Sequence, residues 1–211
     1  MTTTAAVLLA AAGVLALVDW IGVLRHDRRL RVVGKPGTLA LLVAVAVALH
    51  PQHSSVRTWI VIGLVCSLAG DIFLLLPDEE RWFIAGLGSF FVGHVAYVVG
   101  LQLDRRSVAL VGVGLVVVAV CIATIGRRVV AAVRVEHPEL TGPVVAYLLV
   151  ISLMVLSAFG TRNPWAIAGA ATFYASDAIL SWNRFVEERR WGEIGVMVTY
   201  HLAQAGLVLF L

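Results

Sequence analysis

The sequence predicts an all-α, polytopic integral membrane protein with eight transmembrane helices. Of the 211 residues, 60% are hydrophobic and only 14% are charged, and the mean hydropathy is +0.94. Such a composition is typical of membrane proteins and excludes an ordinary water-soluble domain. The apolar residues also gather in runs of about 20, the length that crosses a hydrocarbon core about 30 Å thick. We therefore expect one transmembrane domain over residues 1–211.

The predicted spans follow one another with short connections. The second is short, and we expect it to begin in the Gly34-Lys35-Pro36 turn, because proline is tolerated in the first turn of a helix. Cys66 and Cys121 fall inside spans, where we expect them to pack as small apolar residues. The eight spans cover 5–24, 37–50, 58–76, 82–101, 107–126, 140–159, 164–183 and 192–211.

Basic residues in the loops predict the orientation. The loops after spans one, three, five and seven hold five, one, three and three Lys or Arg residues. The loops on the other side hold four: Arg57, Arg105, Arg106 and Arg162. The positive-inside tendency places the richer side in the cytoplasm and both termini outside it. The pI near 9.2 is then a topology signal of a multi-pass cell-membrane protein, and we expect no nucleic acid partner.

Two acidic residues inside spans are the clearest indication of function. Asp71 and Asp177 occur in the matched settings Ala-Gly-Asp-Ile-Phe-Leu and Ala-Ser-Asp-Ala-Ile-Leu. A carboxyl group at membrane depth costs roughly 2.5 to 3.5 kcal/mol even on lenient insertion scales, which favours a functional role. The alternative is a pair of aspartates that only join helices by hydrogen bonds. Asp19 and Lys35 are expected at the same cytoplasmic depth, in a polar pocket that opens to the inner leaflet, although interfacial positions would also explain them.

An internal repeat relates the two aspartates. Distinctive residues recur at offsets of 106 or 107 positions: Asp71 with Asp177, His94 with His201, and Pro36 with Pro143. The possible halves, 1–101 and 107–211, hold four spans each, so they would point the same way and be related by an axis along the membrane normal. Spans three and seven would then face each other across the centre.

Helical spacing predicts which other polar groups share the pocket. His94 and Tyr97 lie on one face of span four, where glycines recur every seven residues and permit close helix packing: Gly86, Gly93 and Gly100. The remaining candidates are Tyr174 and Ser176 beside Asp177, and a single turn of span eight that holds Tyr200, His201 and Gln204. Each could merely satisfy a neighbour within the bundle, but together they exceed what packing requires.

An ordered series of motifs resembles the YhhN-like lysoplasmalogenase family from span two to span eight. The motifs are Gly34-Lys35-Pro36, Gly70-Asp71, Phe91-Val92-Gly93-His94-Val95-Ala96-Tyr97, Tyr174-Ala175-Ser176-Asp177 followed by Asn183 and Phe185, and Thr199-Tyr200-His201-Leu202-Ala203-Gln204. The resemblance implies hydrolysis of the vinyl ether bond of lysoplasmalogens, which releases a fatty aldehyde and a glycerophospho-base. A lysophospholipid substrate within the lipid bilayer is therefore expected.

This reaction needs one acid and one base, for which Asp71 and Asp177 are the catalytic candidates. Protonation of the β-carbon gives an oxocarbenium ion that water captures, much as two carboxyl groups divide the work in glycosidases. Burial and mutual repulsion favour one protonated aspartate, and Asp177 is slightly preferred as the ionised one. No cofactor or metal is expected, since two mid-span histidines do not make a zinc site. The predicted substrate-binding residues are Lys35, where a phosphate would rest, Asp19, His94, Tyr97, Tyr174, Ser176, Asn183, Tyr200, His201 and Gln204.

Other classes of protein remain open at this stage. A proton-coupled small-molecule transporter would use intramembrane Asp and His residues and would explain the repeat, but its helices would be broken at mid-span. An intramembrane aspartyl protease would also use two aspartates, although the motif order is reversed and no Pro-Ala-Leu element occurs. A haem carrier using His94 and His201 would show a Soret band.

Overall fold

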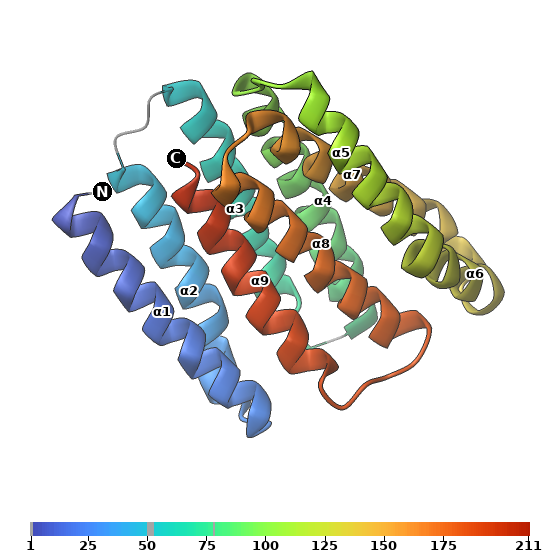
Figure 1. The fold of residues 1–211 in the computed structure, drawn as a ribbon. Coiled ribbons are helices and arrows are strands. Elements are labelled where there is room, and N and C mark those ends of the chain that lie inside the picture. Colours follow the sequence, from blue (N-terminus) through green and yellow to red (C-terminus); the bar gives the residue numbers. More distant parts are fainter. Residues whose placement is uncertain (1, 50–52, 78) are drawn as a thin grey trace.

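The computed structural model describes residues 2–49, 53–77 and 79–211, and within these ranges the chain is helical and has no strand (Figure 1). This confirms the all-α prediction. The two ends of the chain lie at the same end of the bundle (Figure 1). The helices are α1 (Thr3–Leu24), α2 (Arg28–Ala48), α3 (Ser54–Phe73), α4 (Glu79–Leu103), α5 (Val108–Cys121), the π-helix η1 (Ile122–Gly126), α6 (Arg127–Glu136), the 3-10 helix η2 (Pro138–Leu140), α7 (Thr141–Thr161), α8 (Pro164–Phe185) and α9 (Gly192–Leu209).

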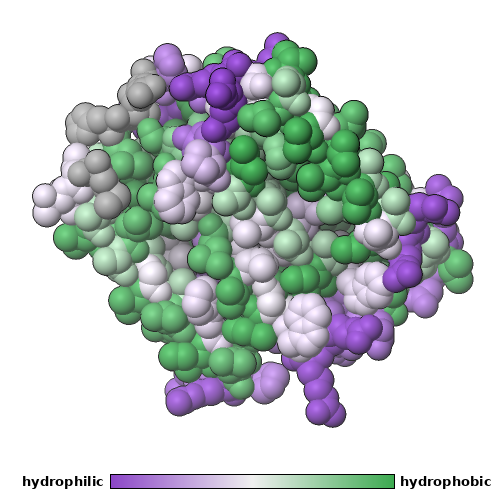
Figure 2. Space-filling view, viewed as in Figure 1, coloured by the Kyte–Doolittle hydropathy of each residue, from purple (hydrophilic) through white to green (hydrophobic). Residues whose placement is uncertain are grey.

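The exterior of the bundle suits a lipid environment. Large apolar side chains point outward, including Val14, Val116 and Leu149, which are 57–64% exposed. Figure 2 shows hydrophobic residues over much of the visible face, with hydrophilic residues gathered toward its edges. In the described residues, six helices are long and apolar enough to cross a membrane: α1, α2, α3, α4, the continuous run from α5 to α6, and η2 with α7. The chain is therefore a polytopic membrane protein, and the eight-span count stays a prediction.

The second helix begins earlier than predicted. The Asp27 side chain accepts hydrogen bonds from the backbone N–H groups of Arg29 and Leu30, and so caps a helix that starts at Arg28. Pro36 consequently lies inside the helix, and the predicted turn around it is wrong. Lys35 is thereby carried into the bundle and is 3% exposed. Residue 50, the predicted end of this span, lies outside the described ranges.

The fifth helix is longer than predicted and continues ten residues past 126. The reason is the packing of α6, where Val129 and Val133 are buried against Val144 and Phe185. The arginines counted as loop residues therefore belong to an amphipathic helix. The π-helix η1 lies where α5 joins α6, and such π segments frequently accompany functional sites.

Glycines bring neighbouring helices into close contact. A Cβ atom on Gly93 would lie 3.1 Å from the carbonyl oxygen of Gly63, so the predicted glycine face of α4 packs against α3. A Cβ on Gly169 would lie 2.9 Å from the backbone N of Leu207, which gives α8 and α9 the same kind of contact. These close pairs fix the depth at which the polar residues of α3, α4, α8 and α9 meet. Cys66 and Cys121 are free thiols.

Candidate active site

A cavity of about 1010 Å³ lies among the described helices and contains both aspartates in its lining. Apart from Lys35, Asp71 and Asp177, its charged or titratable lining residues lie in or beside the loops that follow α1 and α8, at the end of the bundle opposite the termini (Figure 1): His26, Arg31, Arg184, Glu188, Arg189, Arg190 and Glu193. Its apolar lining residues include Trp82, Phe83, Leu87, Phe90, Ile125, Val129, Val130, Val144, Leu148 and Ile151. The cavity thus joins a charged mouth to an apolar arm bordered by α4, α6 and α7.

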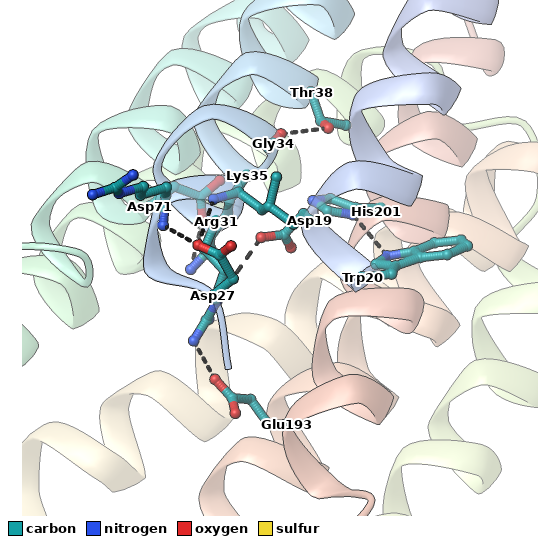
Figure 3. A network of polar contacts seen from close by, with 12 residues as sticks. Asp19, Trp20, Asp27, Arg31, Gly34, Lys35, Thr38, Asp71, Glu193 and His201 are labelled. Atoms are coloured by element: carbon teal, nitrogen blue, oxygen red, sulfur yellow. Dashed lines mark hydrogen bonds and ion pairs between the residues drawn. The ribbon is translucent and has the colours of Figure 1, made fainter. Parts of the chain in front are cut away.

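Asp71 is enclosed in a group that we call the Asp71 cluster: Lys35, Asp71 and Tyr200. The Lys35 Nζ lies 3.2 Å from Asp71 Oδ1, and the Tyr200 hydroxyl donates to Asp71 Oδ2 at 2.8 Å. The Asp71 side chain is 0% exposed and that of Lys35 is 4% exposed. Both carboxylate oxygens therefore face donors. One of these donors, Lys35, carries a positive charge (Figure 3).

Asp177 belongs to a different group, the Asp177 cluster: His94, Tyr147 and Asp177. The Tyr147 hydroxyl donates to Asp177 Oδ2 at 2.9 Å, and His94 Nε2 lies 3.7 Å from the same oxygen. The Asp177 side chain is 14% exposed. This carboxyl group is consequently the more accessible of the two within the cavity.

An aromatic wall connects the two clusters. The ring of Phe173 lies edge-on to Tyr200 with 5.5 Å between centroids, and edge-on to His94 with 4.6 Å between centroids. Next to this wall, the Tyr97 hydroxyl donates to Gln204 Oε1 at 2.6 Å. The two aspartates are therefore held by neighbouring parts of one packed network.

The predicted site residues separate into two sets. Those that line the cavity are Lys35, Asp71, Tyr174, Ser176, Asp177, Asn183 and Tyr200. The other set, Asp19, His94, Tyr97, His201 and Gln204, is buried but lies outside the lining. The Ser176 hydroxyl donates to the backbone carbonyl of Val196, while the side-chain oxygen Oδ1 of Asn183 accepts from the backbone N–H of Arg189. These two residues therefore also hold α8 to α9 and the loop between them.

Behind the Asp71 cluster lies a second layer of polar groups. Arg31 pairs with Glu193 and reaches toward Asp19, with 3.9 Å from Arg31 Nε to Asp19 Oδ1 (Figure 3). The Trp20 indole N–H donates to His201 Nδ1 at 3.0 Å. Asp19 and His201 are thus placed as supporting residues on the α1 side of the cavity.

Sequence reasoning missed Tyr147 and Arg31 as site residues. Tyr147 is one of four tyrosines in the chain, and the other three are all among the predicted site residues. A lone tyrosine at the middle of an apolar span was the available signal. Arg31 was interpreted only as a topology residue, because its contact with Glu193 joins parts of the chain 162 residues apart.

The fold and cavity define a class: a polytopic helical membrane protein with an ionisable pocket reached from one end. The YhhN family model matches residues 30–211, so the chain belongs to the YhhN family, and the resemblance seen in the motifs is confirmed.

Similar proteins carry a consistent name. Proteins called "Lysoplasmalogenase" from Mycobacterium bovis and Mycobacterium tuberculosis are each 34% identical over 152 residues, which is 71% of this chain and 58% of theirs. "Lysoplasmalogenase TMEM86B" of Mus musculus is 31% identical over 173 residues, 80% of this chain and 69% of the relative. The chain thus spans somewhat over half the length of the mycobacterial relatives. No solved structure matches it.

Proposed function

We propose that the protein is a lysoplasmalogenase-like hydrolase, which cleaves the vinyl ether bond of lysoplasmalogens to a fatty aldehyde and a glycerophospho-base. The observation that carries the proposal is that Asp71 and Asp177 both line one cavity with a charged mouth and an apolar arm. Vinyl ether hydrolysis requires a proton donor and a group that stabilises a cation or activates water, and two carboxyl groups can supply both. The names of the relatives support the same reaction.

The cavity accommodates a single-chain lipid in one orientation. The hydrocarbon chain would lie in the apolar arm, next to Phe90, Ile125 and Leu148. The glycerophospho-base would lie at the charged mouth, where Arg184, Arg189 and Arg190 can pair with a phosphate and Glu188 with a cationic base. The vinyl ether, which joins these two parts of the substrate, would then lie between them, beside the aspartates.

Lys35 takes a different part from the one the sequence indicated. Its ammonium group is 3.2 Å from Asp71 and its side chain is almost fully enclosed, so it is committed to that carboxylate. The arginines at the mouth are the better partners for a phosphate. Lys35 consequently belongs with the chemistry of Asp71 rather than with the headgroup.

The orientation in the membrane follows from the same charged end. The mouth of the cavity is formed by the loops that hold most of the basic residues, so the positive-inside tendency places it toward the cytoplasm. Both termini would lie on the opposite side. Substrate would then enter from the inner leaflet.

Aldehyde release tests the proposal. The purified protein should release aldehyde from a lysoplasmalogen, and should release neither aldehyde nor fatty acid from an ester-linked lysolipid of the same chain length and headgroup. A saturated ether lysolipid is the matched control, because it lacks only the double bond. Fatty acid release from the ester would indicate a different hydrolase. Absence of any product, together with proton-coupled uptake of a small solute in proteoliposomes, would favour the transporter instead.

A further inference from the structure

We propose that the two clusters divide the catalytic roles: Asp71 is the carboxylate, with Lys35 as its counter-ion, and Asp177 is the proton donor. This assignment rests on the proposed vinyl ether hydrolysis and reverses the sequence-based prediction that Asp177 is the ionised group. It is carried by the partners of each carboxyl group and by the relation between the two halves of the chain.

The partners of Asp71 complement an ionised carboxylate. Lys35 has only donors to offer, and the Tyr200 hydroxyl also donates, so each oxygen of Asp71 lies opposite a donor. If Asp71 were protonated, the ammonium group of Lys35 would be left in the interior without its counter-charge, which is strongly unfavourable. Asp19 lies 3.9 Å from Arg31, which also pairs with Glu193. Lys35 and Asp71 therefore form a neutral unit.

Asp177 has no such cation. Among the residues that the structure describes, no lysine or arginine lies within ion-pair distance of its carboxyl group, and its charged or polar neighbours are Tyr147 of α7 and His94 of α4. His94 Nδ1 is 2.7 Å from the carbonyl oxygen of Phe90, which can only accept, so Nδ1 carries a proton, and in the neutral ring Nε2 presents a lone pair to Asp177. A carboxylic acid fits this setting, because an unpaired buried carboxylate is unfavourable.

The two clusters occupy equivalent positions in the two halves. Asp71 of α3 contacts Tyr200 of α9, and Asp177 of α8 contacts His94 of α4, so each aspartate contacts the last helix of the other half. Tyr97 and Gln204, which hydrogen-bond to each other, are 107 positions apart.

Helix contacts show the same relation. The contacts of α2 with α3 and with α9 have counterparts in those of α7 with α8 and with α4. The pairs α3 with α4 and α8 with α9 correspond in the same way. We therefore interpret the bundle as two related halves, in which α4 and α9 stay with their own half and also pack against the other.

One position breaks this equivalence. The offset that relates Pro36 to Pro143 places Gly142 at the counterpart of Lys35. A Cβ on Gly142 would meet no atom within 4 Å, so no side chain fills that place. The second half instead uses Tyr147 to bind its aspartate. The presence of a lysine in one half and a glycine in the other is what separates the roles.

The assignment gives a closed catalytic cycle. Asp177 transfers its proton to the vinyl carbon that is not bonded to oxygen; the π electrons form the new C–H bond, and an oxygen lone pair forms the oxocarbenium C=O bond. Water attacks the carbon of the oxocarbenium C=O bond and gives a proton to Asp71, which yields a hemiacetal. Asp177 then removes the hemiacetal hydroxyl proton, the bond to the glycerol oxygen breaks, and Asp71 protonates that oxygen. The aldehyde and the glycerophospho-base leave, and both aspartates regain their starting states.

Infrared difference spectroscopy of the protein without substrate tests the assignment. The parent protein should show the carbonyl stretch of a buried carboxylic acid, which is lost in Asp177→Asn and retained in Asp71→Asn. Asp19→Asn is the control, since Asp19 is a further carboxyl group inside the bundle and is 0% exposed. If Asp71→Asn does not fold, the double variant Lys35→Met with Asp71→Asn, which removes both charges, takes its place. The assignment would be overturned if the band were lost in Asp71→Asn, or in the double variant used in its place. Retention of the band in Asp177→Asn would overturn it as well.

A thermal double-mutant cycle provides a second readout that is also independent of activity. Lys35→Met should lower the unfolding temperature in detergent, and adding Asp71→Asn should recover most of the loss, because the uncompensated charge is removed. The same lysine change combined with Asp177→Asn should give additive losses. Coupling of Lys35 to Asp177 instead of Asp71 would contradict the proposal. Since neither readout uses a lysoplasmalogen, failure of the proposed function would appear separately, as a lack of aldehyde release.

Discussion

The Asp71 and Asp177 clusters stabilise their carboxyl groups with different sets of partners. Both hold a carboxyl group inside a membrane bundle with a tyrosine hydroxyl 2.8 or 2.9 Å from one oxygen. The first adds a lysine and excludes solvent completely, whereas the second adds a neutral imidazole and leaves 14% of the aspartate side chain exposed. On the proposed assignment, this difference gives two related positions opposite chemical roles through a single charged neighbour.

Removing either carboxyl group should cause the largest loss of activity. Asp71→Asn and Asp177→Asn should each lower kcat/KM by at least about 10² to 10⁴-fold, the usual contribution of general acid or base catalysis. Asparagine keeps the volume and can still accept a hydrogen bond, so both variants should insert. Asp71→Asn should unfold at a lower temperature, because it leaves Lys35 without its counter-charge. Aldehyde release and unfolding temperature measure the two effects. More than about a tenth of the parent activity in a folded variant would show that its carboxyl group is structural.

Lys35→Met should produce the next largest effect. Breaking a buried ion pair by removing one partner costs about 3 to 5 kcal/mol of stability. Because Lys35 holds Asp71 rather than the phosphate, the kinetic loss should fall mainly on kcat, measured at saturating lysoplasmalogen. Arg189→Gln, at the mouth, is the comparison variant and should raise KM instead. A rise in KM alone for Lys35→Met would return that residue to the headgroup.

Removing the Tyr200 hydroxyl should lower activity more than removing the Tyr147 hydroxyl, because on the proposed assignment only Tyr200 donates to an ionised carboxylate. Tyr200→Phe removes a bond to a carboxylate, worth about 1.5 to 3 kcal/mol, whereas Tyr147→Phe removes a bond between neutral groups, worth about 0.5 to 1.5 kcal/mol. In kcat/KM this corresponds to about 13 to 160-fold against about 2 to 13-fold. Equal losses, or a larger loss for Tyr147→Phe, would argue against the difference in charge.

Substitutions of glycines at helix contacts should have the smallest effects, and these should appear in stability. Gly169→Ala would bring a Cβ within 2.9 Å of the backbone of α9, and should destabilise the protein by about 1 to 3 kcal/mol. Gly88→Ala on α4 meets open space, and should be neutral or slightly stabilising. Chemical or thermal unfolding in detergent measures both. Equal stability of the two variants would show that α8 and α9 do not rely on this contact.

The class of fold could be predicted because hydropathy and span length depend only on local sequence. The same holds for Asp71 and Asp177, since a charged residue in an apolar run is conspicuous by itself. The depth of Lys35 could not be obtained in this way, because it depends on where α2 begins, and that start is set by the cap at Asp27. The pairing of Tyr147 with Asp177 depends on how α7 packs against α8, a contact between spans that no periodicity reports.

Hydrolysis in heavy water tests the central claim most directly, since protonation of carbon by the enzyme leaves a permanent label. The protein should release aldehyde that carries one deuterium on the carbon next to the carbonyl, detected by mass spectrometry. Authentic aldehyde incubated alongside corrects for exchange, and Asp177→Asn should give almost no labelled product. Aldehyde released by the parent protein without that deuterium, or labelled aldehyde formed at the full rate by Asp177→Asn, would contradict the account.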